Sequence, residues 1–245
     1  MIRLIPVACL FILLGCLGSP LEAQTVKVQY KKFIVPGNTD YGRWVSSPAQ
    51  KREMREREEK IANTVSEYYT LITNGKQSFF AFDTLIQTSQ IEERDSWWRR
   101  ANNVKMTQAK DLRKGTITHR SPLLSDSVCQ SENFRTKYQW TPAEGLRIFA
   151  GLPCQKLIHL TEEKDSIIVW YTPEIPMNDG PEVFGGAPGL ILAVEAPNFN
   201  YIAEEVEVGE FEFPKAPLPA ENCLKEKDFQ QKMRTAAIQE FMKND

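Results

Sequence analysis

Alternating apolar and polar residues predict a strand near the N-terminus and a β-hairpin farther along. Val26-Lys27-Val28-Gln29-Tyr30 changes character at every residue, which is typical of a strand with one buried face. Aromatic and β-branched residues flank Asn74-Gly75 on both sides. Asn-Gly is the strongest short-range signal for a two-residue hairpin turn, so we expect residues 67–72 and 78–82 to pair.

Strand signals crowd together after residue 115. Runs rich in β-branched and aromatic residues, separated by Pro, Gly and acidic turns, cover residues 116–119, 135–140, 146–149, 155–160, 166–171 and 190–192. Short strands at this spacing without intervening helices favour an antiparallel sheet. Within residues 205–213 the apolar positions change from even to odd at Gly209, and this change of phase predicts a β-bulge there.

Two segments have the period of a helix. Residues 51–60 are almost all charged, and opposite signs stand one helical turn apart, which predicts a solvated helix near 47–64. Phe229, Met233, Ala237 and Phe241 recur at one-turn spacing and predict an amphipathic helix near 224–243 that covers one sheet face. The fold class that follows is mainly β (α+β): an antiparallel sheet or an open half-barrel with covering helices.

The composition suits one folded domain rather than a disordered or low-complexity chain. Of the 245 residues, 42% are hydrophobic and 25% are charged, which is enough apolar material to bury a core. The formal net charge is −2, and this balance argues against a protein built mainly to bind nucleic acid. We therefore expect no nucleic acid among its partners and no selection of partners by gross charge.

The first 23 residues have the character of a secretory signal peptide. Arg3 is followed by an apolar run that meets no further charge before Glu22 and is too short to span a membrane. Ala23 is the small residue that signal peptidase requires, so we expect cleavage before Gln24 and a periplasmic or secreted mature protein. The alternative is a lipobox, Leu13-Leu14-Gly15-Cys16, whose acylated Cys16 would anchor the chain to a membrane. No later segment is apolar enough for a transmembrane span.

Three cysteines remain after that cleavage: Cys129, Cys154 and Cys223. Export places them where disulfides persist, and an odd number allows one internal bridge at most. We expect Cys129 to pair with Cys154, because consecutive strands usually lie side by side. The alternative, Cys154 with Cys223, would staple the C-terminal helix to the sheet. The wide spacing is not that of a zinc site, and no metal or cofactor is expected.

One region carries a specific combination of motifs. Ile168-Val169-Trp170-Tyr171-Thr172-Pro173-Glu174-Ile175-Pro176 is followed by Gly180-Pro181 and then by Phe184-Gly185-Gly186-Ala187-Pro188-Gly189-Leu190-Ile191-Leu192. With Leu152-Pro153-Cys154-Gln155-Lys156 and the hairpin over 68–80, these motifs resemble the GLPGLI family of secreted Bacteroidota proteins. The resemblance covers most of residues 65–208 and implies a single GLPGLI-like domain over 24–245. Ala187 departs from the family signature, which has Leu there, and the family carries no established activity to transfer.

The glycine-rich part of this motif has a structural and a functional interpretation. Gly185-Gly186 and Pro188-Gly189 specify a turn in which glycine can take positive φ and proline fixes φ. This alone explains the signature as a corner that delivers Leu190-Ile191-Leu192 into a buried strand. In the functional interpretation the bare backbone leaves room for a ligand or partner. The binding residues would then be Trp170, Tyr171, Glu174, Gly186, Pro188 and Gly189.

No motif in the chain specifies a reaction. The glycine-rich turn lacks the Lys-Ser/Thr of a phosphate loop, and neither a G-x-S-x-G elbow nor an H-E-x-x-H pair occurs. His159 lies five residues from Cys154, which places the two on opposite faces of a strand and argues against a dyad. No catalytic residue is therefore assigned, and Glu174 is expected to be an exposed or turn-capping acid.

These observations predict a non-enzymatic, exported envelope protein that binds a protein partner or an apolar ligand on its sheet. A deep apolar cavity would favour ligand carriage, whereas a flat, filled sheet would favour a protein-interaction module. The alternative is an envelope enzyme of unknown chemistry. That function requires polar groups that converge in a pocket near Glu174 or near one of the two histidines, His119 and His159.

Overall fold

The computed structural model describes residues 25–37, 47–87, 107–121, 124, 129–134, 137–162, 164–214 and 223–242. The expected signal peptide, its cleavage site and the lipobox lie outside these residues. The described elements are β1 (Thr25–Ile34), α1 (Pro48–Thr64), β2 (Val65–Thr73), β3 (Gln77–Gln87), β4 (Thr107–Asp111), β5 (Thr116–Arg120), β6 (Gln130–Asn133), β7 (Thr141–Phe149), β8 (Leu152–Leu160), β9 (Ser166–Thr172), β10 (Leu190–Glu195), β11 (Phe199–Gly209) and α3 (Glu226–Met242).

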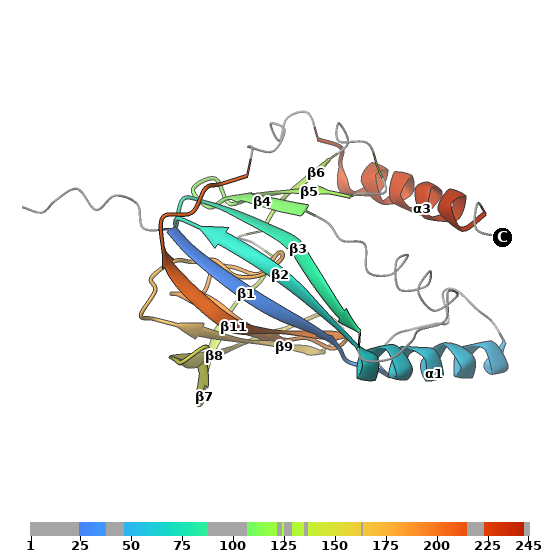
Figure 1. Cartoon of the computed structure of the whole chain (residues 1–245), viewed down its shortest axis with the longest axis horizontal. Helices are drawn as coiled ribbons and strands as arrows, with labels where there is room; N and C mark the ends of the chain where they lie inside the picture. The colour runs from blue at the N-terminus through green and yellow to red at the C-terminus, as the bar shows by residue number, and fades with distance from the viewer. Residues whose placement is uncertain are drawn as a thin grey trace, which may run out of the picture.

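The described strands form one 11-stranded sheet in the order β6-β5-β4-β3-β2-β1-β11-β10-β9-β8-β7. Neighbouring strands are antiparallel throughout. In Figure 1, β1, β2, β3 and β11 cross the middle of the molecule, while β7 and β8 lie at its lower side and β4, β5 and β6 at its upper side. The predicted class, mainly β with an antiparallel sheet, is confirmed.

Each helix lies against a different part of the sheet. The charged helix α1 leads directly into β2 and contacts β1 and β2, and its Arg57 Nη2 lies 2.5 Å from Glu53 Oε1, one turn away. α3 contacts β6, the end strand, and buries Phe229 completely. Both helices therefore occur where the periodicity predicts them. Within the described residues neither is long and apolar enough to cross a membrane.

The hairpin β2–β3 forms as expected around Asn74-Gly75. Gly75 takes a φ of +73°, a conformation that suits glycine. The Asn74 side-chain oxygen accepts hydrogen bonds from the backbone N–H groups of Lys76 (3.0 Å) and Gln77 (2.9 Å). The strands predicted over 26–30, 116–119, 146–149, 155–160, 166–171 and 190–192 are also present.

Two strand predictions are wrong in detail. Residues 137–140 have no regular structure, because Tyr138 and Trp140 stack on each other at 5.1 Å and Tyr138 stacks on Phe184 at 5.1 Å instead of alternating across a sheet. The bulge expected at Gly209 is absent, since β11 ends there, opposite Thr25, where β1 begins. The β1–β11 register shifts instead between Gln29 and Tyr30.

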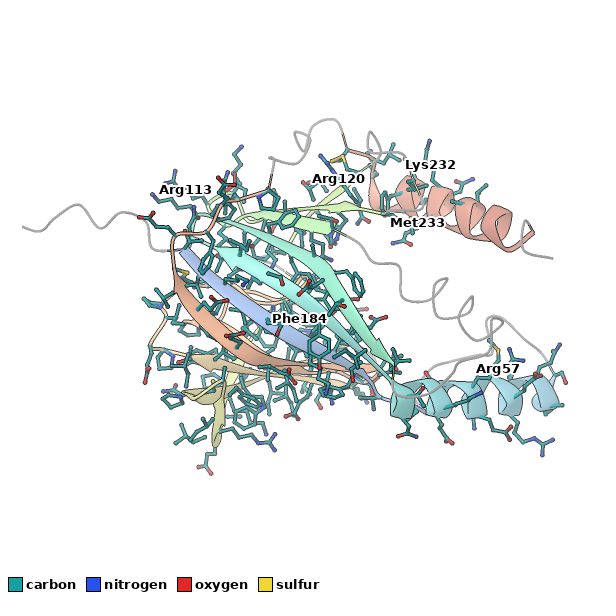
Figure 2. The ribbon with its side chains drawn as sticks, in the orientation of Figure 1. Arg57, Arg113, Arg120, Phe184, Lys232 and Met233 are labelled. Carbon is teal, nitrogen blue, oxygen red and sulfur yellow. A yellow bond between two sulfur atoms is a disulfide. The ribbon has the colours of Figure 1, made fainter. Side chains whose placement is uncertain are left out.

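A cluster of aromatic rings fills the inner face of the sheet, which we define as the face that carries Tyr30, Tyr69 and Phe80. Tyr69 stacks on Phe80 with ring centroids 5.2 Å apart, and the Tyr201 ring meets both rings edge-on at 5.8 and 5.9 Å. Such pairs add about 1 kcal/mol each beyond the burial of their area. The connector, defined as residues 173–189 between β9 and β10, lies over this face and buries Phe184, labelled in Figure 2, and Ala187.

Candidate functional site

A buried lysine fixes the connector to the inner face. The Lys110 ammonium on β4 donates to Asp179 Oδ1 (2.8 Å), to the Gly180 carbonyl (2.6 Å) and to the Phe184 carbonyl (3.0 Å). The side chains of Lys110 and Asp179 are 1% and 0% exposed. Burial lowers the pKa of Lys110, and the nearby Asp179 opposes that shift. All three ammonium protons are therefore used to hold one chain segment.

Glu182 provides a second anchor for the connector. Its Oε1 accepts hydrogen bonds from the Tyr201 hydroxyl and, at 3.3 Å, from the Lys32 ammonium. The Lys32 ammonium also lies over the rings of Phe199 (5.0 Å) and Tyr201 (5.2 Å). Burial raises the pKa of Tyr201, so its hydroxyl stays a donor. Glu182 takes a φ of +45°, which is uncommon for a residue other than glycine, and these contacts hold it there.

The glycines of the motif serve close packing. A Cβ on Gly189 would lie 2.1 Å from the Thr172 carbonyl oxygen, and one on Gly180 would lie 2.8 Å from Ile191 Cβ. Gly186 takes a φ of +82° and lies near Trp140, whose indole N–H donates to the Gly185 carbonyl at 2.8 Å. These contacts explain the signature as a corner of the fold.

The six candidate binding residues do not converge. Trp170 and Tyr171 are neighbours in β9 and therefore face opposite sides of the sheet. The Tyr171 hydroxyl donates to Gln155 Oε1 (2.7 Å), and the Trp170 indole N–H donates to Glu195 Oε1 (2.9 Å). The other candidates lie on the connector; Glu174, Gly186 and Pro188 are exposed and Gly189 is buried. A ligand role for this set stays a prediction.

The outer face of β9 carries a cation–aromatic cluster that sequence reasoning missed. The Arg147 guanidinium lies 4.7 Å from the Trp170 ring centre and the Lys156 ammonium 5.9 Å from it. Arg147 Nη1 also pairs with Glu195 Oε1 at 2.9 Å. Phe149 lies 6.1 Å from the same ring. Arg147 and Phe149, alternate residues of β7, thus pack on Trp170, and the residues between them point away from it.

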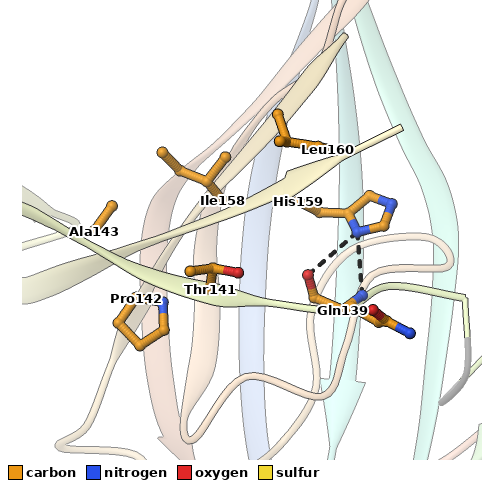
Figure 3. Close-up of a pocket in the computed structure, with 7 residues that line it drawn as sticks. All are labelled: Gln139, Thr141, Pro142, Ala143, Ile158, His159 and Leu160. Carbon is orange, nitrogen blue, oxygen red and sulfur yellow. Dashed lines mark hydrogen bonds between the residues drawn. The ribbon is translucent and has the colours of Figure 1, made fainter. Parts of the chain in front are cut away.

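Those outward residues form the most exposed apolar surface of the described sheet. Leu146 is 71% exposed and Ile148 is 72% exposed, on a strand that pairs with β8 alone among the described strands. On the opposite face, Leu160 is 69% exposed beside an open hollow of about 450 Å³. His159 lines this hollow and its Nδ1 meets the backbone N and O of Gln139 at 3.1 and 3.2 Å (Figure 3).

The two histidines and Cys154 do not form a catalytic group. His119 is buried on β5, where its Nδ1 accepts from the Gln108 amide (3.2 Å) and its Nε2–H donates to Glu132 (2.9 Å). Cys154 is fully buried in β8, and burial raises the pKa of its thiol to about 11, so it is protonated at neutral pH. Among the described residues no cluster of three or more His, Cys, Asp or Glu could hold a metal.

The disulfide joins Cys129 to Cys223, with Cα atoms 4.7 Å apart, and Cys154 is a free thiol. The expected bridge between Cys129 and Cys154 is therefore wrong, and so is the alternative between Cys154 and Cys223. The physical reason is the strand order: Cys129 precedes the end strand β6, whereas Cys154 lies in β8 near the opposite end of the sheet. Consecutive strands β6 and β7 are not neighbours here, so the rule behind the prediction fails.

Comparison with known families gives one match, described as "Protein of unknown function (Porph_ging)", over residues 86–193. The matched range includes the motif at 168–192 but excludes the hairpin β2–β3 up to residue 85 and the C-terminal helix. It supports a relationship to a family of unknown function, and the GLPGLI name stays a prediction. Curated proteins give no match.

Solved structures with a similar fold include PNGF-II in the C2 and P21 space groups. Each aligns with a TM-score of 0.55 at 13% identity and covers 87% of this chain. This chain spans about a third of the PNGF-II chains, 33% and 34%. At this identity the likeness shows the fold alone. An uncharacterized conserved protein from Thermus thermophilus, with a TM-score of 0.38 at 6% identity over 84% of this chain and 92% of its own, carries no argument.

Proposed function

We propose that this protein is a non-enzymatic partner-binding module of the cell envelope. The carrying observation is that the inner face, where an apolar ligand would bind, is occupied by the protein's own connector. Phe184 and Ala187 are buried there, and Lys110 and Glu182 fix the segment at two points. An apolar ligand would have to break a buried ion pair to enter, and breaking such a pair costs about 3–5 kcal/mol. Carriage of a ligand is therefore disfavoured.

The geometry also disfavours the enzyme alternative. Glu174 is exposed on the connector, His119 is held in a buried network on β5, and His159 lines the hollow at the far end of the sheet. A reaction needs such groups within hydrogen-bond reach of one substrate atom. The similarity to PNGF-II supports a modular role, because there a fold of this kind accounts for about a third of a longer chain.

Partner binding is assigned to the exposed apolar side chains of β7. Surface apolar residues scattered singly are ordinary, but Leu146 and Ile148 form a pair on one sheet edge. Envelope localisation rests on the signal-peptide pattern at residues 1–23, with lipid anchoring through Cys16 as the alternative.

The test combines native mass spectrometry with site-specific crosslinking on protein made in its own cells. We expect an N-terminus at Gln24, no bound lipid, and a crosslinked protein when a photoreactive residue replaces Ile148. The matched control places that residue at Val208 on β11, which is 55% exposed, and should give no adduct. A lipid bound in stoichiometric amount would overturn the proposed function, and an acylated Cys16 would overturn the soluble state.

A further inference from the structure

The open part of the β7 edge is confined to residues 146–149. In the first half of β7, Pro142 has no N–H to donate, and the register with β8 shifts between Ala143 and Leu146. Both features discourage strand pairing there. From Leu146 onward the pairing with β8 is regular, so alternate N–H and C=O groups point to the side where the sheet order ends. This edge carries Leu146 and Ile148 on one face and Arg147, which is 57% exposed, on the other.

A second segment of the chain has strand character but forms no strand. Residues 210–213, Glu210-Phe211-Glu212-Phe213, alternate between acidic and aromatic side chains. They follow β11, which ends at Gly209 because its partner β1 begins opposite it at Thr25. In the structure residues 210–214 are irregular, with Glu210 and Glu212 exposed and the two phenylalanines partly so. This segment, which we name the EFEF segment, is therefore a strand-forming sequence at an exposed end.

The EFEF segment and the β7 edge are complementary in chemistry and in register. If they pair antiparallel with Arg147 opposite Glu212, then Leu146 lies opposite Phe213 and Ile148 opposite Phe211. The charges then meet on one face and the apolar side chains on the other, and each such cross-strand pair stabilises the sheet. A slip by one residue would place phenylalanine against Arg147, so the register is specific. Arg147 uses Nη1 for Glu195, and its other guanidinium N–H groups can bind a second carboxylate.

The two elements cannot meet within one chain. Arg147 lies beside Glu195, which pairs with Asn200 at the start of β11, whereas the EFEF segment follows the other end of that strand. A strand of this length spans roughly 30 Å, which no four-residue extension can bridge back. We propose that residues 146–149 of one copy pair with the EFEF segment of a second copy. This inference rests on the proposed partner-binding function and names the partner as the protein itself.

The contact is head-to-tail, because each copy offers one β7 edge and one EFEF segment. Heterologous contacts of this kind close into a ring or extend into an open chain. Only four residues pair on each side, so the association is expected to be weak and to rise with concentration. Because one charged pair is included, high salt should weaken it.

The first experiment measures self-association of the purified full chain by sedimentation velocity over increasing concentration. We expect the wild type to associate, Leu146→Arg to remain monomeric and Leu160→Arg to associate as the wild type does. Leu160 is the matched control because it is equally exposed on the same hairpin but on the opposite face. A synthetic peptide of residues 206–214 should compete with the wild type and not bind Leu146→Arg.

A charge exchange tests the register. Arg147→Glu should weaken association about tenfold, and Arg147→Glu combined with Glu212→Arg should restore it, because the pair is reformed with reversed signs. Circular dichroism and thermal unfolding establish that each variant is folded. A monomeric wild type at all concentrations, equal loss in Leu160→Arg, or no rescue by the double variant would each overturn the inference.

The outcome separates this inference from the proposed function. If the chain stays monomeric while a photoreactive residue at Ile148 is crosslinked to a different protein in cells, the second copy is wrong and partner binding stands. If bound lipid is found instead, partner binding itself fails.

Discussion

The two end strands of the sheet, β6 and β7, differ in what lies beside them. Outside β6, Leu224 N donates to the Cys129 carbonyl at 2.7 Å and bridges Gln130, the Cys129–Cys223 disulfide closes the contact, and Phe229 of α3 is buried nearby. Outside β7 the described residues offer no such cover, and Leu146 and Ile148 stand in solvent. Sheet edges are sites of unwanted pairing that proteins usually protect. The same fold protects one edge covalently, so the exposure of the other fits a role in assembly.

Loss of the disulfide should have the largest effect on this comparison. The bridge closes a sequence separation of 94 residues, and chain entropy assigns such a link about 4 kcal/mol of folding stability. We expect Cys129→Ala with Cys223→Ala to lower the free energy of unfolding in urea by about that amount. Hydrogen exchange at residues 130–133 should accelerate, because the covering segment leaves. The reduced wild type is the control and should match the variant; an unfolding curve unchanged by reduction would contradict the prediction.

The inner contacts of β7 are tested by a glycine substitution with a smaller effect. Gly145 takes a φ of +148°, and a Cβ there would lie 3.0 Å from the Trp170 ring. Gly145→Ala should therefore cost about 2 kcal/mol of folding stability, from backbone strain and displacement of the ring. Gly151→Ala is the matched control, since its φ is +78° and a Cβ would meet nothing within 4 Å. It should cost about 1 kcal/mol from strain alone. Equal losses for the two variants would show that β7 does not pack on Trp170.

The β6 edge was less predictable from sequence than the central hairpin. Asn74-Gly75 determines β2–β3 by local turn chemistry, and the charge pairs of α1 act within one helical turn, so both are readable from short windows. The pairing of Cys129 with Cys223 depends instead on which strand ends the sheet, and local patterns do not specify strand order. The chain runs from one end of the sheet at β6 to the other at β7 across residues 134–140.

The anchors of the connector escaped sequence reasoning for a similar reason. Lys110 lies in Thr107-Gln108-Ala109-Lys110-Asp111, which has the polarity of an exposed strand. Its partner Asp179 is 69 residues away in an irregular segment, and only the assembled sheet brings the two together. A buried lysine is costly unless paired, so nothing local marks it as buried. The glycine corner, by contrast, was readable because close packing leaves its mark in the composition of the turn itself.

A carboxylate on β6 should make that edge sensitive to acid. The hydrogen bond from His119 lowers the pKa of Glu132, with Lys137 contributing in the same sense and burial opposing it; Tyr138 also lies close enough to feel this charge. A carboxyl more acidic in the folded state stabilises the protein above its unfolded pKa, near about 4.3, and loses that contribution as pH falls through the folded pKa. We expect Glu132→Gln to cost on the order of 1 kcal/mol at pH of about 7 and less near pH of about 3. Urea unfolding at both pH values measures it, and a cost independent of pH would contradict the assignment.

The smallest effect on folding is expected at the outer face of β7. Leu146→Ser with Ile148→Ser removes two side chains that are 71% and 72% exposed, so little buried apolar area is lost. Surface changes of this kind stay within about 0.5 kcal/mol, and the free energy of unfolding should remain that of the wild type. Ser at both positions nevertheless removes the apolar half of the edge, so any self-association should fall. Phe229→Ser is the contrasting control, because the same chemical change in a fully buried side chain beside β6 should cost about 3 kcal/mol or more. Measured together by urea unfolding and sedimentation, the pair distinguishes an edge kept for folding from an edge kept for binding. A large loss of folding stability in the β7 variant would show that this surface is covered within the chain itself, and the contrast between the two edges would then not hold.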